Sequence, residues 1–278
     1  MSNTTNNPLR QFFRRPGLYL KLPSNGIGYV DGIIDFPDNG ELPVYPMTAI
    51  DEITSRTPDA LFNGVAVTEI IKSCIPAIKD PWQVLSIDLD AILIAIRIAT
   101  NGQAMEIDST CPACTEVSKF DVSLPGILGT LKPGDYNTPV KVMDDLLIKF
   151  KPLTYKQISK ASERQFDIAK LLREVEQISD IEEKNKKSTE LMAILNELSF
   201  QIMIETIEYM KTPEVTVFEK EFITEFLTNC DKNTHTFLKD KNTELRKTTE
   251  LKPLEITCSH CGHKHEQEFN INVSDFFV

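Results

Sequence analysis

Two stretches far apart in the chain, MEIDSTCPACTEVSKFDVSL at 105–124 and LEITCSHCGHKHEQEFNINV at 254–273, share one pattern. Each contains Glu-Ile, a Thr directly before Cys-x-x-Cys, a short polar tip and a β-favouring exit with a Phe, at Phe120 or Phe269. Apolar and β-branched residues on both sides of a polar turn are typical of a β-hairpin. Both stretches are therefore expected to fold as strand, knuckle and strand.

The two Cys-x-x-Cys pairs have the spacing of zinc ligands. Two Cys three positions apart in a tight turn can direct both sulfurs at one ion, and tetrahedral Zn²⁺ takes four such ligands. We expect Cys111, Cys114, Cys258 and Cys261 to bind one structural Zn²⁺. Two sequence-distant β-hairpins would then form a four-cysteine zinc ribbon, and metal binding would contribute directly to folding.

Other interpretations of the cysteines stay open. A dithiol redox pair fits less well, because neither pair lies at the start of a helix after a parallel strand. Reduced thiols without a metal are a further alternative. The rings of His260, His263 and His265 could replace a cysteine ligand, although a solvated position on the hairpin is simpler. Cys74 and Cys230 are interpreted as small core residues.

Outside the knuckles, the pattern predicts an α+β fold. Turn signals separate short β-like runs within 18–47, and residues 139–150 resemble two strands around a turn at Asp144-Asp145. Apolar residues cover nearly the whole circumference of a helix at 86–100, which should lie at the centre of the core. We expect a mixed N-terminal domain, a zinc ribbon and a helical insertion. Along the chain these are an N-terminal arm and short β segments (1–47), a helical core block (48–103), the first knuckle with the following strands (104–150), a helical insertion (151–250) and the second knuckle (251–278).

The insertion is expected to contain a helical hairpin. Apolar residues keep three-and-four spacing from Ile158 to Val175 and again from Leu191 to Ile202. The polar stretch SDIEEKNKKST at 179–189 is interpreted as the connection between the two helices. Thr216-Val-Phe-Glu219 matches a capping box, which would open a helix carrying Phe218, Phe222 and Phe226 on one stripe.

Composition and motifs exclude several classes of function. Lys and Arg number 30 against 41 Asp and Glu, a net charge of −11, which disfavours binding to a phosphate backbone. The most apolar run, 91–99, is far shorter than the roughly 20 residues that span a bilayer, so we predict no membrane span. The chain has no Gly-rich phosphate loop, nucleophile elbow or His-Glu-x-x-His run. We therefore predict that it is not an enzyme and binds no small-molecule substrate.

Two other features have competing interpretations. The basic and aromatic run LRQFFRRPG contains Arg10, Phe12, Phe13, Arg14 and Arg15, which could dock on an acidic partner, or could form a solvated start of the domain with both Phe side chains packed inward. Arg97 lies within an apolar helix, where it could pair with a buried carboxylate or contact a partner. A side chain that extends to solvent at the helix edge is the simpler interpretation of Arg97.

Several stretches between Leu9 and Cys114 resemble the baseplate hub proteins of T4-like contractile-tailed bacteriophages: LRQFFRRPG, YPMTAIDEI, SRTPDALFNG, SCIPAIKDPW, DLDAILIAIRIATNG and CPAC. The resemblance implies a structural subunit or an assembly protein of the tail baseplate hub. Its partners would be other phage baseplate hub or tail proteins, in the host cytoplasm during assembly or in the virion. The alternative function is a zinc-ribbon nucleic-acid-binding regulator, which the net charge disfavours.

Overall fold

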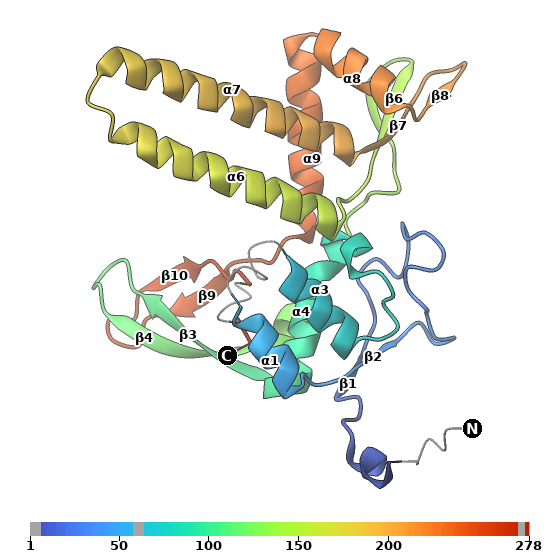
Figure 1. Ribbon diagram of the computed structural model, residues 1–278, viewed down its shortest axis with the longest axis vertical. Coiled ribbons are helices and arrows are strands. Elements are labelled where there is room, and N and C mark those ends of the chain that lie inside the picture. Colours follow the sequence, from blue (N-terminus) through green and yellow to red (C-terminus); the bar gives the residue numbers. More distant parts are fainter. Residues whose placement is uncertain (1–6, 58–63, 272–275, 278) are drawn as a thin grey trace.

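In the computed structural model, which describes residues 7–57, 64–271 and 276–277, the chain has an α+β fold with two halves that lie end to end (Figure 1). The lower half of Figure 1 contains the first and the last described residues and both knuckles. Its elements are η1 (Pro8–Phe12), β1 (Leu18–Leu20), β2 (Leu42–Val44), α1 (Ala49–Ser55), α3 (Val65–Cys74), η2 (Pro81–Gln83), α4 (Ser86–Asn101), β3 (Ala104–Thr110), β4 (Val117–Ser123), α5 (Leu124–Leu128), β9 (Leu254–Thr257) and β10 (Lys264–Gln267).

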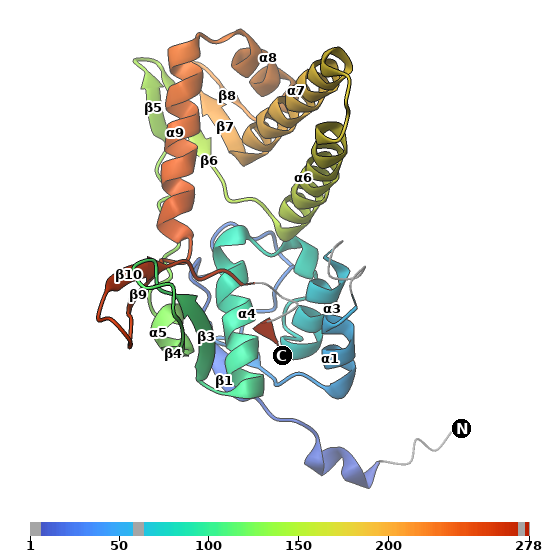
Figure 2. The ribbon, with the colours of Figure 1, turned by 90° about the vertical axis from the view of Figure 1, so that its left-hand side faces the viewer.

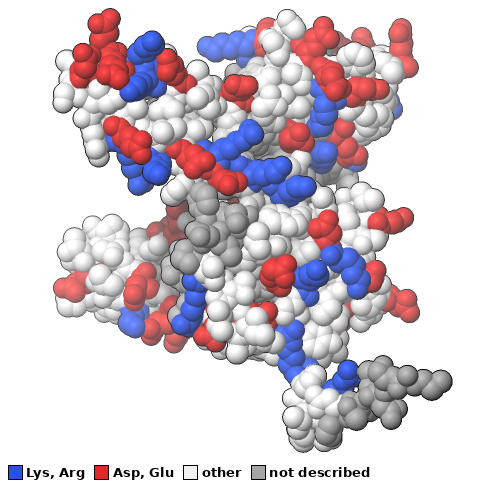
Figure 3. Space-filling view, viewed as in Figure 1, with Lys and Arg blue, Asp and Glu red and all other residues white. Residues whose placement is uncertain are grey.

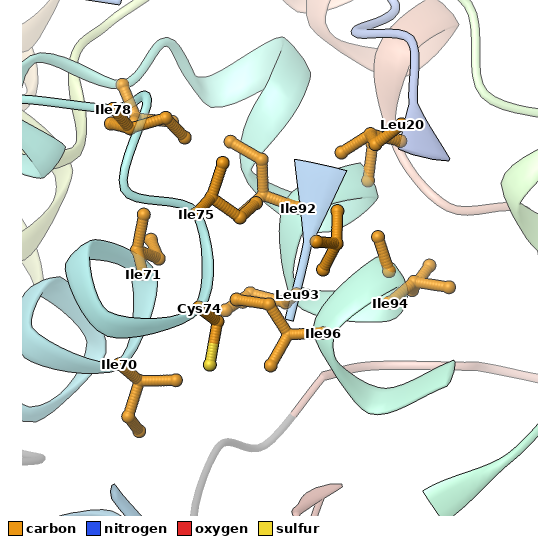
Figure 4. Close-up of a cluster of buried hydrophobic side chains, with 14 of the residues drawn as sticks. Leu20, Ile70, Ile71, Cys74, Ile75, Ile78, Ile92, Leu93, Ile94 and Ile96 are labelled. Atoms are coloured by element: carbon orange, nitrogen blue, oxygen red, sulfur yellow. The ribbon is translucent and has the colours of Figure 1, made fainter. Parts of the chain in front are cut away.

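Helix α4 is the centre of the lower core, as its apolar circumference predicts. Ile92, Ile94 and Ile96 are fully buried, and α3 packs against them with Ile70 and Ile71 (Figure 4). The small antiparallel pair β1–β2 covers another side of α4. Arg97 is only 9% exposed, and its Nε and Nη1 atoms are buried without a hydrogen-bond partner in the described chain. The interpretation that Arg97 extends to solvent is therefore wrong.

The upper half combines a four-stranded antiparallel sheet with four helices. Its elements are β5 (Val140–Met143), β6 (Leu146–Phe150), α6 (Tyr155–Glu176), α7 (Ile181–Thr206), β7 (Ile207–Lys211), β8 (Thr216–Val217), α8 (Lys220–Asn229) and α9 (Lys232–Thr249). The strand order is β5-β6-β7-β8, and a separate core of nine buried residues, with Ile148 and Ile207 fully buried, joins the sheet to α7, α8 and α9. The segment between the knuckles is thus not only helical.

Three expectations about the upper half need correction. The connection within the α6–α7 hairpin is residues 177–180, because Asp180 caps α7 by accepting from the backbone N–H of Glu183, so most of 179–189 is helical. Thr216 belongs to β8, and α8 begins at Lys220 without a side-chain cap, so the capping box is wrong. Phe218 lies before the start of α8, so it does not share a stripe of this helix with Phe222 and Phe226, and both Phe218 and Phe222 are mostly exposed.

The α6–α7 hairpin extends away from the sheet (Figures 1 and 2). Four buried side chains form its own small core: Ile168, Val175, Leu191 and Leu198. Among the described helices, none is both long and apolar enough to cross a membrane.

Candidate metal centre

Each knuckle is closed by the same pair of backbone hydrogen bonds. In the first, the Cys111 N–H donates to Glu116 O at 3.0 Å, and the Thr115 N–H donates to Cys111 O at 2.9 Å. In the second, Cys258 donates to His263 O and Gly262 to Cys258 O, both at 2.9 Å. The residue after the second Cys is left-handed in both turns, with φ of 61° at Thr115 and 74° at Gly262. The two knuckles are therefore copies of one turn, and the first places a β-branched residue where glycine is favoured.

The two turns meet, and their four sulfurs form one cluster. The Sγ atoms of Cys111, Cys114, Cys258 and Cys261 all lie within 4.8 Å of one another. Cys111 Sγ is 3.6 Å from Cys261 Sγ, and Cys114 Sγ is 3.8 Å from Cys258 Sγ. Sulfurs held about 2.3 Å from a tetrahedral zinc ion lie about 3.8 Å apart. The sulfurs are therefore spaced as metal ligands, and all four cysteines are free of disulfides.

The local hydrogen bonds explain how such a cluster becomes charged. Backbone N–H groups of Cys261 and His260 donate to the sulfur of Cys258 and lower the pKa of its thiol to about 6. At Cys114 the backbone N–H of Glu116 acts in the same direction, but burial and the three neighbouring sulfurs raise the pKa of the thiol to about 12. One thiolate therefore forms readily, whereas four adjacent thiolates need a cation among them.

A polar bridge holds the inner faces of the two hairpins together. The hydroxyl of Ser109 on β3 donates to Gln267 Oε1 on β10 at 3.0 Å. Ser109 Oγ also lies 3.0 Å from His265 Nε2, and because its hydrogen is already given to Gln267, the imidazole N–H must donate. Nε2 of His265 is thus occupied at Ser109, whereas Nδ1 is buried without a hydrogen-bond partner among the described residues. Sequence reasoning missed this bridge, since nothing in either hairpin alone indicates which residues of the other it meets.

Comparison with known proteins identifies the family. The family model of the T4 bacteriophage base plate protein matches residues 45–278. The chain belongs to this family. The match includes both knuckles of this base plate family member and supports a structural role in the phage tail. No curated protein and no solved structure matches the chain.

The N-terminal arm of this base plate family member, residues 7–17, lies outside the matched range and projects from the lower half (Figures 1 and 2). Its side chains divide into two groups. Arg14 is part of the fold, because Nη1 donates to Pro46 O at 2.6 Å and Nη2 to Ser73 O at 2.7 Å. Phe12 and Phe13 are 76% and 59% exposed, so they do not pack inward. Arg10 and Arg15 are exposed beside them.

The remaining cysteines differ from each other. Cys74 is fully buried in the lower core, as expected for a small core residue. Cys230 is half-buried at the end of α8, where its thiol lies 3.5 Å from Leu227 O. Neither belongs to the four-sulfur cluster, so Cys230 offers a cysteine that can be changed as a control.

Proposed function

We propose that this chain is a non-enzymatic structural or assembly protein of a phage tail baseplate hub, and that its four clustered cysteines bind one structural Zn²⁺. The observation that carries the proposal is the family match over a range that contains all four converging sulfurs. Four sulfur ligands are typical of structural zinc and leave no coordination position for a substrate.

The metal would act as a clip between distant parts of the chain. Cys111 and Cys261 are 150 residues apart in sequence, and the whole upper half lies between the two knuckles. Closing a loop of this length by a metal restricts the unfolded chain strongly. Zinc would therefore hold the base from which the upper half projects.

Metal analysis of the purified protein tests this role. We expect about one zinc per chain by plasma mass spectrometry, and little zinc in a Cys111→Ser/Cys114→Ser variant. Cys230→Ser is the matched control and should keep its metal. Purified chain with intact cysteines and no bound zinc after expression in zinc-supplemented medium would disprove the metal proposal.

The alternative function in nucleic-acid binding is disfavoured by the charge of the ribbon itself. The ranges 104–123 and 254–268 together contain seven acidic side chains and only two lysines, Lys119 and Lys264. A zinc ion held by four thiolates leaves a further negative charge. Strong, salt-sensitive binding of DNA or RNA in a gel-shift experiment would favour this alternative.

The exposed arm is proposed as a docking segment for another hub or tail protein. Arg10, Phe12, Phe13 and Arg15 combine positive charge with two exposed rings, which suits an acidic partner surface with an apolar pocket. Arg14 would serve mainly to hold the arm at its base. Co-expression with the neighbouring tail proteins of the same phage should yield a complex that Phe12→Ser/Phe13→Ser weakens without changing the melting temperature.

The place where the protein acts is a separate question, which fractionation of infected cells addresses. A subunit of the mature hub would be present in purified virions, whereas an assembly factor would be found only in the infected-cell cytoplasm. Immunoblotting of both fractions separates these two forms of the proposal.

A further inference from the structure

A cleft of about 930 Å³ lies where the two halves of the described chain meet. Its lower wall is the loop that follows β1, with Ile27, Tyr29 and Val30. Its upper wall is the end of β6 and the start of α6, with Lys149, Lys151 and Lys156 among the lining residues. Neither the metal cluster nor the N-terminal arm takes part in this cleft.

The walls of the cleft are held in place by buried hydrogen bonds. The Tyr29 hydroxyl donates to Asp88 Oδ2 at 2.8 Å, and the fully buried carboxylate of Asp88 also accepts from the Ser24 N–H at 2.8 Å. Across the junction, the Tyr155 N–H donates to Val84 O at 2.7 Å. The Ser86 N–H donates to Leu153 O at 2.8 Å. The cleft is therefore formed before any ligand enters it, which favours binding.

The cleft contains positive charge that the chain itself does not neutralise. Lys149 pairs with Glu208 at 3.2 Å, whereas Lys151 and Lys156 form no ion pair with any described residue. Burial lowers the pKa of Lys220, Glu205 raises it, and the charge of Lys151 lowers it again, so the field of Lys151 extends to a neighbouring lysine. Lys151 and Lys156 therefore leave two positive charges in the cleft available to a ligand. In Figure 3, Lys and Arg side chains lie at the level where the two halves meet, with Asp and Glu side chains beside them.

The unpaired lysines require a ligand with negative charge, and exposed apolar side chains that line the cleft require that the ligand also carries apolar groups. Ile27 is 57% exposed and Val30 is 73% exposed, although both are large aliphatic residues. A polyphosphate has no apolar groups and would gain nothing from contact with these side chains. A peptide with alternating acidic and apolar residues meets both requirements, because alternate side chains of an extended strand point to opposite faces.

We propose that this cleft binds an extended acidic segment of a partner protein, with its carboxylates on Lys151 and Lys156 and its apolar side chains on Ile27 and Val30. This inference rests on the proposed function only in that the segment would come from another tail protein. The lysines give recognition of charge, and the aliphatic pair excludes water from the contact.

Fluorescence anisotropy with the full-length chain tests the proposal. The probe is a labelled hexapeptide of alternating Glu and Val, and the control probe has Lys in place of Glu. We expect saturable binding of the acidic probe with a dissociation constant below about 1 mM, and no saturable binding of the basic one. Lys151→Glu/Lys156→Glu should weaken binding about tenfold or more, because two attractive contacts become repulsive.

Matched variants distinguish binding in the cleft from a general effect of the net charge of the chain. Lys170→Glu/Lys186→Glu makes the same charge change at exposed positions of the α6–α7 hairpin and should leave binding unchanged. Val30→Asp should weaken binding without a change in lysine content. Absence of saturable binding at about 2 mM probe, or an equal effect of both double variants, would overturn the proposal.

Two further measurements complete the experiment. If an oligothymidine binds more tightly than the peptide and loses affinity in Lys151→Glu/Lys156→Glu, the cleft is a phosphate site and the proposal is wrong. Zinc content and melting temperature are measured on the same samples. In the unmodified chain, absence of peptide binding with zinc present would refute the cleft alone, and absence of zinc with peptide binding present would refute the metal centre alone.

Discussion

Removal of the cysteine cluster should cost a large part of the stability of the chain. In the variant Cys111→Ser/Cys114→Ser, the first knuckle can no longer be joined to the second through a metal. The loop closed between Cys111 and Cys261 has 150 residues. Applied to such a loop, the chain-entropy relation for a cross-link gives about 5 kcal/mol at 25 °C. This is comparable to the whole unfolding free energy of many domains, which is about 5–15 kcal/mol.

Thermal unfolding followed by circular dichroism measures the effect. For a chain of this size a loss of about 5 kcal/mol corresponds to a fall in Tm of about 10 °C or more. A chelator should lower the Tm of the unmodified protein by a similar amount and should leave the double variant unchanged, because its metal is already lost. Cys230→Ser provides the control for replacement of a cysteine outside the cluster.

Two results would contradict a stabilising link between the knuckles. If Cys111→Ser/Cys114→Ser melted at the temperature of the unmodified chain, the link between the knuckles would contribute nothing to stability. A chelator effect of equal size in the unmodified chain and the double variant would likewise show that the metal acts elsewhere.

Three further predictions concern single residues. Burial and the charge of Glu250 raise the pKa of Asp90 from 3.8 to about 6, so folding stability should fall as pH rises through that window. Asp90→Asn should therefore raise stability at pH 7 by at most about 3 kcal/mol, and the gain in urea titrations should vanish near pH 4. Thr115→Gly should stabilise the first knuckle by up to about 1 kcal/mol, because Thr115 has a left-handed φ of 61°, whereas Gly262→Thr should destabilise the second; equal melting temperatures for the two variants would contradict this. Arg14→Ala should cost about 2–3 kcal/mol in the same urea titrations, because its guanidinium donates to two backbone carbonyls that would lose these partners, and a cost below about 0.5 kcal/mol would show that these contacts do not hold the arm.

Features with a local chemical signal were predictable from the sequence. The spacing of the two Cys pairs and the β-favouring residues around them led to the convergence of Cys111, Cys114, Cys258 and Cys261, although 144 residues separate Cys114 from Cys258. The apolar circumference of 86–100 likewise led to a central helix, now seen as α4. In both cases the residues themselves carry the information, as metal ligands or as side chains that must avoid water.

Features that depend on distant pairing were not predictable. Strand β7 begins at Ile207, directly after α7 ends at Thr206, with no glycine or proline between them. The helix gives way to a strand here because Tyr209 and Met210 pair with the edge of β6, which lies more than 50 positions earlier in the sequence. Thr216 is drawn into the same sheet by its pairing with Lys211, which overrides the local capping pattern. These positions follow tertiary hydrogen bonds that no short window of sequence contains.

The cysteine cluster and the cleft lie at different attachments of the same upper half. The chain enters the upper half after α5 and returns to the ribbon at β9, so the cysteine cluster ties together the two segments that border it. A separate attachment is the isolated bridge between Leu85 and Thr154, beside the cleft. Two separated attachments restrict the rotation of one half against the other far more than either would alone. A partner segment bound in the cleft would contact Val30 on the lower wall and Lys151 on the upper wall, so its affinity would depend on the relative position of the two halves.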